Sequence, residues 1–235
     1  MATRLLRPLH RGPVLEFVRD AGLALCSGWP KRFQKIGTAN ETLVQAIMTY
    51  YRAKVFIDKG NVALRLKYLL RIPSFDIKVI RLVRDGRAVA LTYMDPAGFA
   101  DAKDPNRRGG GSGGTREDER LSMTQAAHEW RRSNEEAEHV LRGLDESRWT
   151  EVRYEELCLN PEATLHRLFT FLDVDPAKQI EGFRFAENHV VGNGMRLDTT
   201  SEIELDERWR KQLTEADLQT FDDVAGHLNR RYGYA

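Results

Sequence analysis

Short apolar runs alternate along this chain with segments whose apolar residues recur at helical spacing. Runs rich in β-branched residues, bounded by polar or glycine-containing turns, predict strands at residues 54–57, 79–83 and 149–154. Helices are predicted before, between and after them, over residues 38–50, 61–71, 86–93, 126–144, 161–172 and 214–228. Strands that alternate with helices predict an α/β fold: three layers, with a mostly parallel sheet flanked by helices.

Two of the predicted helices carry recognisable start signals. Thr38-Ala39-Asn40-Glu41 has the form of a capping box, and Asn160-Pro161-Glu162 supplies an N-cap, a proline and an acid in the first turn. Residues 1–53 are predicted to form a helical N-terminal region and residues 54–235 an α/β domain. The glycine-rich residues 95–119 are predicted to form a flexible loop, which is either a lid or a plain surface insertion.

Composition narrows the possible partners. The formal net charge of +1 gives no sign of a nucleic-acid partner, so any anion site must be local. The two cysteines, Cys26 and Cys158, form no metal-binding or disulfide pattern, and we expect no metal and two idle thiols in a reducing compartment. No apolar run reaches the ~20 residues of a membrane span, and the basic start lacks a signal-peptide core, so we expect a cytoplasmic protein.

The most informative stretch is KVIRLVRDGRAVALTY, residues 78–93. A predicted strand ends at Arg84-Asp85-Gly86-Arg87, and a predicted helix carrying Thr92 follows. In an α/β protein such a strand-to-helix turn is suited to a phosphate, because a guanidinium, unpaired backbone N–H groups and the helix dipole meet there. The alternative is structural: Arg84 pairs with Asp85 or Glu155, and the Thr92 hydroxyl bonds back to its own helix.

Four stretches, in order, resemble sulfotransferases that use 3′-phosphoadenosine 5′-phosphosulfate (PAPS), especially bacterial and carbohydrate-type members. VIRLVRDGRAVALTY is similar to their 3′-phosphate segment, with Thr92 eight positions after Arg84. Phe56-Ile57-Asp58 with the following RLKYL resembles their second strand and helix. Val152 to Leu157 with the following NPE resembles their RYEDL…DPE segment. Finally, HVVGNGMR at 189–196 and the terminal YGY resemble their GNPMR…RYGY arrangement.

This resemblance implies a P-loop NTPase-like sulfotransferase fold and transfer of a sulfonate group from PAPS to a hydroxyl or amine acceptor. It implies that Arg84 and Thr92 contact the 3′-phosphate, that Tyr154 borders the adenine, and that Arg196 is a second phosphate contact. Tyr154 is equally open to being an ordinary half-buried strand residue, and Arg196 to being an exposed loop charge. His189 is interpreted as a structural loop residue.

One part of the family pattern is missing. The 5′-phosphosulfate loop, which normally follows the first strand, has no clear match, and the nearest candidate, CSGWPKR at residues 26–32, has Pro30 where a helix should begin. Asp58-Lys59-Gly60-Asn61 also departs from the usual Asp-Ser-Ser-Lys. The resemblance therefore implies an N-terminally incomplete fold with no catalytic residue or general base identified. The alternative function is a truncated or inactive homologue that retains only 3′-phosphate binding.

Overall fold

The computed structural model describes residues 13–25, 28–59, 63–95, 120–178 and 203–235. It divides into two compact units. The first lies within residues 1–77 and 136–144, and the second within residues 78–135 and 145–235. The division after residue 53 that the sequence predicts falls inside the first unit, and it stays a prediction about domains.

The first unit is helical. It contains α2 (Pro13–Leu25), α3 (Gly28–Tyr51), α4 (Ala63–Leu69) and the last residues of α7 (Met123–Leu141). Asp20 of α2 accepts a hydrogen bond of 2.6 Å from Lys67 Nζ of α4. Gly37 of α3 packs against the buried Ile72, which lies 3.6 Å from the position that a Cβ at residue 37 would take. These contacts join α2 to α4, and α3 to the chain after α4.

Two sequence predictions in this unit are wrong. Thr38 does not cap a helix, because α3 begins ten residues earlier at Gly28, and its hydroxyl donates to the Gln34 carbonyl oxygen at 3.0 Å within the helix. Residues 54–57 are not a strand: they lie outside any helix or strand, and Phe56 and Ile57 are 39% and 79% exposed. A β-type composition forms a strand only where a neighbouring strand takes up its backbone hydrogen bonds.

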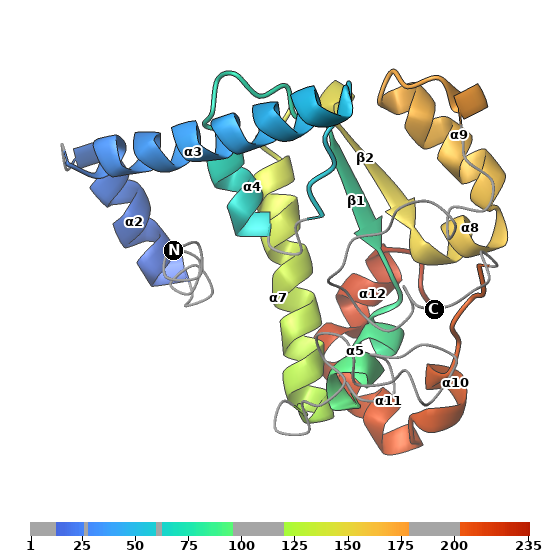
Figure 1. Cartoon of the computed structure of the whole chain (residues 1–235). Coiled ribbons are helices and arrows are strands. Elements are labelled where there is room, and N and C mark those ends of the chain that lie inside the picture. Colours follow the sequence, from blue (N-terminus) through green and yellow to red (C-terminus); the bar gives the residue numbers. More distant parts are fainter. Residues whose placement is uncertain (1–12, 26–27, 60–62, 96–119, 179–202) are drawn as a thin grey trace, which may run out of the picture. The chain divides into compact units, whose positions relative to one another are not determined.

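The second unit contains the sheet (Figure 1). β1 (Val79–Val83) pairs in parallel with β2 (Trp149–Arg153), in a register from Val79 opposite Trp149 to Val83 opposite Arg153. The connection between them carries α5 (Gly86–Met94) and the first part of α7. The prediction of an α/β fold with a parallel sheet is confirmed, and within the described residues that sheet has two strands.

Besides short 3-10 helices at Glu146–Arg148 and Pro176–Lys178, the remaining elements of this unit follow β2. They are α8 (Tyr154–Leu159), α9 (Pro161–Phe171), α10 (Trp209–Gln212), α11 (Glu215–Phe221), a π-helical turn (Asp222–Gly226) and α12 (His227–Arg231). Pro161 begins α9 as predicted, but the Asn160 side chain makes no capping hydrogen bond. Thr214 forms a full capping box with Asp217 at the start of α11.

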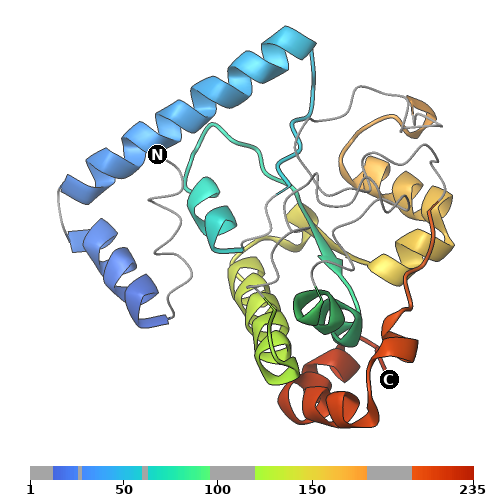
Figure 2. The ribbon, with the colours of Figure 1, turned by 60° about the horizontal axis from the view of Figure 1, so that its bottom comes forward.

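The core of the second unit lies between α5, α7 and the C-terminal helices, which run side by side in Figures 1 and 2. Its central aromatic contact joins Trp130 of α7 and Phe221 of α11, with ring centroids 5.8 Å apart. Gly86, the first residue of α5, fits under this pair only because it has no side chain. A Cβ there would stand 2.4 Å from Phe221 Cζ and 2.8 Å from the Trp130 ring. The turn after β1 is therefore fixed by close packing.

Candidate functional site

The parallel register brings Arg84 and Tyr154 together. Val83 and Arg153 are the last paired residues of β1 and β2, so the next residue of each strand leaves the sheet at the same edge. There the Arg84 guanidinium carbon lies 4.3 Å from the centroid of the Tyr154 ring, a cation–π arrangement. Two predicted site residues that are far apart in the sequence thus share one place, at the carboxyl end of the strands.

The hydrogen-bond partner of Arg84 is Asp206, a residue that no sequence pattern singled out. Arg84 Nη2 donates to the Asp206 carbonyl oxygen and to its Oδ2, both at 3.0 Å. The two side chains are 21% and 19% exposed. The alternative that Arg84 pairs with Asp85 or Glu155 is wrong, because both of those carboxylates have other partners. Arg84 Nε is buried and has no hydrogen-bond partner.

Asp206 is also held by Arg208. Arg208 donates to Asp206 Oδ1 from Nε at 2.9 Å and from its backbone N–H at 3.1 Å. Burial alone would raise the pKa of Asp206, but these hydrogen bonds and the one from Arg84 lower it to about 2. The carboxylate is therefore ionised at every physiological pH, and two guanidinium groups donate to it.

The same short segment contacts Tyr154. The Asp206 backbone N–H donates to the Tyr154 hydroxyl oxygen at 3.3 Å, and that hydroxyl donates to the Glu204 carbonyl oxygen at 3.4 Å. Burial, followed by a hydrogen bond involving Cys158, raises the pKa of the Tyr154 hydroxyl. Residues 204–206 thus contact both side chains: Glu204 and Asp206 bind the Tyr154 hydroxyl, and Asp206 also binds Arg84.

Thr92 is one of the predicted phosphate contacts, and its hydroxyl is engaged inside its own helix. Thr92 Oγ1 donates to the Ala88 carbonyl oxygen at 3.1 Å, which is the structural alternative stated for this residue. A phosphate would need that hydroxyl proton, so the side chain would have to give up this bond to serve it. The role of Thr92 toward a phosphate stays a prediction.

The expected unpaired N–H groups at the start of α5 are already satisfied. Asp85 caps the helix by accepting from the Arg87 N–H at 2.9 Å, and Asn229 Oδ1 accepts from the Gly86 N–H at 2.8 Å. The Asp85 N–H donates to Glu155 Oε1 at 3.1 Å. The prediction that this helix start offers free backbone donors is therefore wrong for residues 85–87, because side chains of the same unit accept from them.

These groups belong to a connected set that we call the Asp85 cluster: Asp85, Arg87, Glu155, Asn229 and Tyr234. Asp85 is 5% exposed and is bound by Arg87 Nη2 at 2.7 Å. Tyr234 donates from its hydroxyl to Glu155 Oε2 at 2.6 Å, and burial raises the pKa of that hydroxyl. The terminal Tyr-Gly-Tyr, noted only as part of a resemblance, thus closes the turn between β1 and α5 from the C-terminal side.

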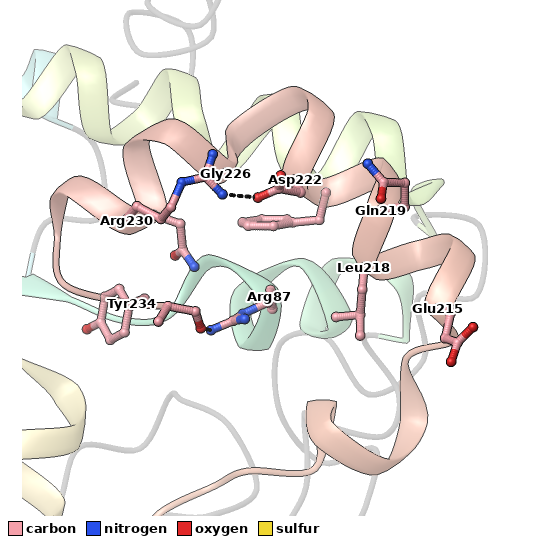
Figure 3. Close-up of a pocket in the computed structure, with 11 residues that line it drawn as sticks. Arg87, Glu215, Leu218, Gln219, Asp222, Gly226, Arg230 and Tyr234 are labelled. Carbon is pink, nitrogen blue, oxygen red and sulfur yellow. Dashed lines mark hydrogen bonds and ion pairs between the residues drawn. The ribbon is translucent and has the colours of Figure 1, made fainter.

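Two hollows adjoin the cluster. The smaller, of about 250 Å³, is lined by both carboxylates of the cluster together with Arg153 and Asp206. The larger, of about 330 Å³, lies between α5 and α11, where Figure 3 shows Arg87 and Tyr234 on one side and Arg230 paired with Asp222 on the other. The smaller hollow therefore opens beside the partner of Arg84.

Other predicted features lie outside the described residues. Arg196 and His189 belong to residues 179–202, residues 96–119 hold nearly all of the predicted loop, and Cys26 and Ser27 open the donor-loop candidate. The chain on both sides of the predicted loop is joined, because the Leu121 N–H donates to the Tyr93 carbonyl oxygen at 3.0 Å. Among the described residues, no cluster of His, Cys, Asp and Glu could hold a metal ion, and no helix could cross a membrane.

Comparison with the profiles of known families identifies one family for this chain. The profile of the Sulfotransferase family matches residues 29–178, more than half of the chain. Carbohydrate sulfotransferase 5 of Mus musculus is 28% identical over 174 residues, which cover 71% of this chain and 44% of the mouse protein. The chain thus spans less than half the length of this relative. A solved sulfotransferase domain from the curacin biosynthetic pathway is similar with a TM-score of 0.49 and 17% identity, covering 83% of this chain and 68% of that one.

Proposed function

The chain belongs to the sulfotransferase family, and from that premise we propose that it transfers a sulfonate group from PAPS to a hydroxyl or amine acceptor. In this proposal Arg84 binds the 3′-phosphate of the nucleotide and Tyr154 borders its adenine. The observation that carries the proposal is that these two side chains meet at the carboxyl edge of a parallel sheet, with the Arg84 guanidinium carbon 4.3 Å from the centroid of the Tyr154 ring. Ligands of open α/β sheets bind at that edge.

The chemistry of Arg84 supports this role. A guanidinium has five donors in a planar fork that matches the oxygens of a phosphate, and such charge-assisted hydrogen bonds are among the stronger ones in proteins. Arg84 uses Nη2 for Asp206, while its Nε remains without a partner. The site therefore has donor capacity that its present contacts do not exhaust, and an aromatic ring, that of Tyr154, adjoins it.

Sulfonate transfer fixes what the rest of the site must do. The acceptor oxygen or nitrogen attacks the sulfur while the bond from sulfur to the bridging phosphate oxygen breaks, and the acceptor loses a proton. Adenosine 3′,5′-bisphosphate is the leaving group. The proposal assigns nucleotide binding to Arg84 and Tyr154, with Thr92 and Arg196 as further phosphate contacts, and assigns no residue to the proton transfer. Because the mouse relative is named a carbohydrate sulfotransferase, a sugar hydroxyl is the first acceptor class to test.

Calorimetric titration with adenosine 3′,5′-bisphosphate tests the nucleotide site. We expect the wild-type chain to bind, and Arg84→Ala to bind about 10- to 100-fold more weakly, because it removes charged hydrogen bonds to the phosphate. Arg142→Ala, which removes an exposed arginine of the other unit, is the matched control and should leave the affinity unchanged. An Arg84→Ala variant with full affinity would refute the assignment, and so would the absence of binding heat from both the wild type and Asp206→Asn.

A transfer assay then tests the reaction itself. The full chain is incubated with PAPS labelled in the sulfonate group and a panel of carbohydrate, phenol and amine acceptors. Label that moves to one acceptor class, and less so with Arg84→Ala, supports the proposed transfer. Tight nucleotide binding with no transfer to any class would instead favour the homologue that only binds the nucleotide.

A further inference from the structure

Arg84 is held by a carboxylate at the place where the proposed function requires a phosphate. Asp206 binds it through one guanidinium nitrogen, Nη2, and supplies both acceptors, its carbonyl oxygen and Oδ2. Residues 203–206 form neither helix nor strand, and the backbone joins α10 only from Glu207 onward, whose carbonyl oxygen accepts from the Arg210 N–H. The chain's own Asp206 carboxylate therefore binds the guanidinium of Arg84, which the proposed function assigns to the phosphate.

Asp206 can leave Arg84 without becoming an uncompensated charge. Its Oδ1 accepts from Arg208 Nε at 2.9 Å, and Arg208 Nη2 reaches Oδ2 at 3.1 Å. Breaking one side of a buried ion pair is costly when the remaining charge has no other partner. Here the second guanidinium, two residues along the chain, contacts both carboxylate oxygens and would continue to neutralise them. Arg84 in turn would lose the Asp206 carboxylate and gain the phosphate of the nucleotide.

The segment also holds the second residue of the proposed site. The Tyr154 hydroxyl accepts from the Asp206 N–H and donates to the Glu204 carbonyl oxygen. A displacement of Asp206 would free the phosphate-binding and the adenine-binding side chains together. One segment, residues 203–208, therefore binds both Arg84 and Tyr154. We call this segment the latch.

We propose that the latch is autoinhibitory: the Asp206 carboxylate occupies the phosphate position on Arg84 until a 3′-phosphorylated nucleotide displaces it. This inference rests on the proposed function, because it takes Arg84 as the 3′-phosphate site. The observed affinity for the nucleotide is then the intrinsic affinity multiplied by the fraction of molecules whose latch is open. A phosphate dianion carries more charge than a carboxylate and offers more oxygens to the guanidinium, so it can win this competition.

Titration of the full chain with adenosine 3′,5′-bisphosphate tests the latch through Asp206→Asn, which keeps the shape of the side chain and removes its charge. We expect binding about 5- to 30-fold tighter than wild type. Glu207→Gln is the matched control: it removes the same charge one residue away, from a carboxylate that pairs with Arg210 instead of Arg84. It should change the affinity less than twofold. An Asp206→Asn affinity equal to wild type, or an equal gain in Glu207→Gln, would overturn the latch.

Hydrogen–deuterium exchange of the wild-type chain gives a second, independent readout. A bound nucleotide usually slows amide exchange. An opening latch would instead expose the Asp206 N–H, which donates to the Tyr154 hydroxyl oxygen in the closed arrangement. We therefore expect the peptide covering residues 203–208 to exchange faster when adenosine 3′,5′-bisphosphate is bound. Slower exchange there would show that Asp206 stays in place and would overturn the proposal.

The outcomes separate the two proposals. Nucleotide binding that depends on Arg84 but is unaffected by Asp206→Asn leaves the proposed function standing and removes the latch. Binding detected only in Asp206→Asn supports both, with a latch that is nearly always closed. Absence of binding in wild type and in Asp206→Asn refutes the nucleotide site and the latch together.

Discussion

Arg84 and Asp85 are neighbours in the sequence, yet they belong to two different kinds of surroundings. Asp85 is 5% exposed, and four groups of its own unit donate to it: the Arg87 N–H, Arg87 Nε and Nη2, and Asn229 Nδ2. Arg84 is bound by a segment without regular structure, through a partner that a second cation shares. One residue is a fixed part of the fold, and the other is exchangeable.

The difference shows how a strand-to-helix turn can be rigid while the residue beside it is held only through an exchangeable partner. Arg84 directly follows β1, whereas Asp85 is the N-cap of α5, and the two side chains have different partners: Asp206 for Arg84, and Arg87 with Asn229 for Asp85. The Asp85 cluster fixes the backbone next to Arg84, which limits the positions that the Arg84 side chain can take. A binding group held by a well-packed neighbourhood is pre-organised for its ligand.

The largest effect that tests this comparison is on stability. We expect Asp85→Ala to lower the free energy of unfolding by about 3–5 kcal/mol, because it strips the buried partner from Arg87 and the cap from α5. Arg84→Ala, one residue away, should cost less than about 1 kcal/mol, since Asp206 retains Arg208. Urea denaturation followed by circular dichroism measures both. Equal losses in the two variants would remove the distinction between a fixed and an exchangeable residue.

Gly86 sharpens the same comparison through packing instead of charge. We expect Gly86→Ala to cost about 1–3 kcal/mol, because its Cβ would overlap Phe221 and Trp130, two large buried rings that have little room to move. Gly143→Ala is the matched control, since its Cβ would make an ordinary contact at 3.6 Å. The two melting temperatures should therefore separate clearly. A Gly86→Ala protein as stable as Gly143→Ala would mean that the turn after β1 is loosely packed.

The sequence predicted the second unit better than the first. Val79–Val83 and Trp149–Arg153 combine β-type composition with turn residues at both ends, and each finds the other as its partner, so both strands are confirmed. Residues 54–57 have the same composition but form no strand. Thr38 followed by Glu41 has the letters of a capping box, yet it lies inside a continuous helix. Local patterns state what a segment can become, and tertiary partners decide the outcome.

The candidate site was predictable in part for the same reason. Arg84 and Tyr154 stand at the ends of strands, so their meeting follows from parallel pairing. Asp206 lies in a stretch without periodicity, and only the folded chain brings it to Arg84. The backbone donors of the α5 start were expected to be free because sequence patterns do not reveal that Asn229 and Glu155 reach them from other elements.

The smallest expected effect concerns the pH dependence of the exchangeable side. The pKa of Asp206 is about 2 in the folded chain, against ~3.9 for an unperturbed aspartate. Because the folded value is depressed, the unfolded chain binds more protons in this range. The stabilisation is therefore complete above about pH 5 and is lost as the pH falls toward 2. Solvent screening of this partly exposed pair limits the stabilisation to about 1 kcal/mol.

Urea titrations should show Asp206→Asn less stable than wild type at pH 7 by this amount, with the two curves of unfolding free energy against pH converging near pH 2. Glu207→Gln, compared in the same way, is the matched control: it removes one carboxylate charge that pairs with Arg210 and not with Arg84. A constant gap between wild type and Asp206→Asn at every pH would mean that the loss comes from packing, and that the charge of Asp206 has no part in holding the latch on Arg84.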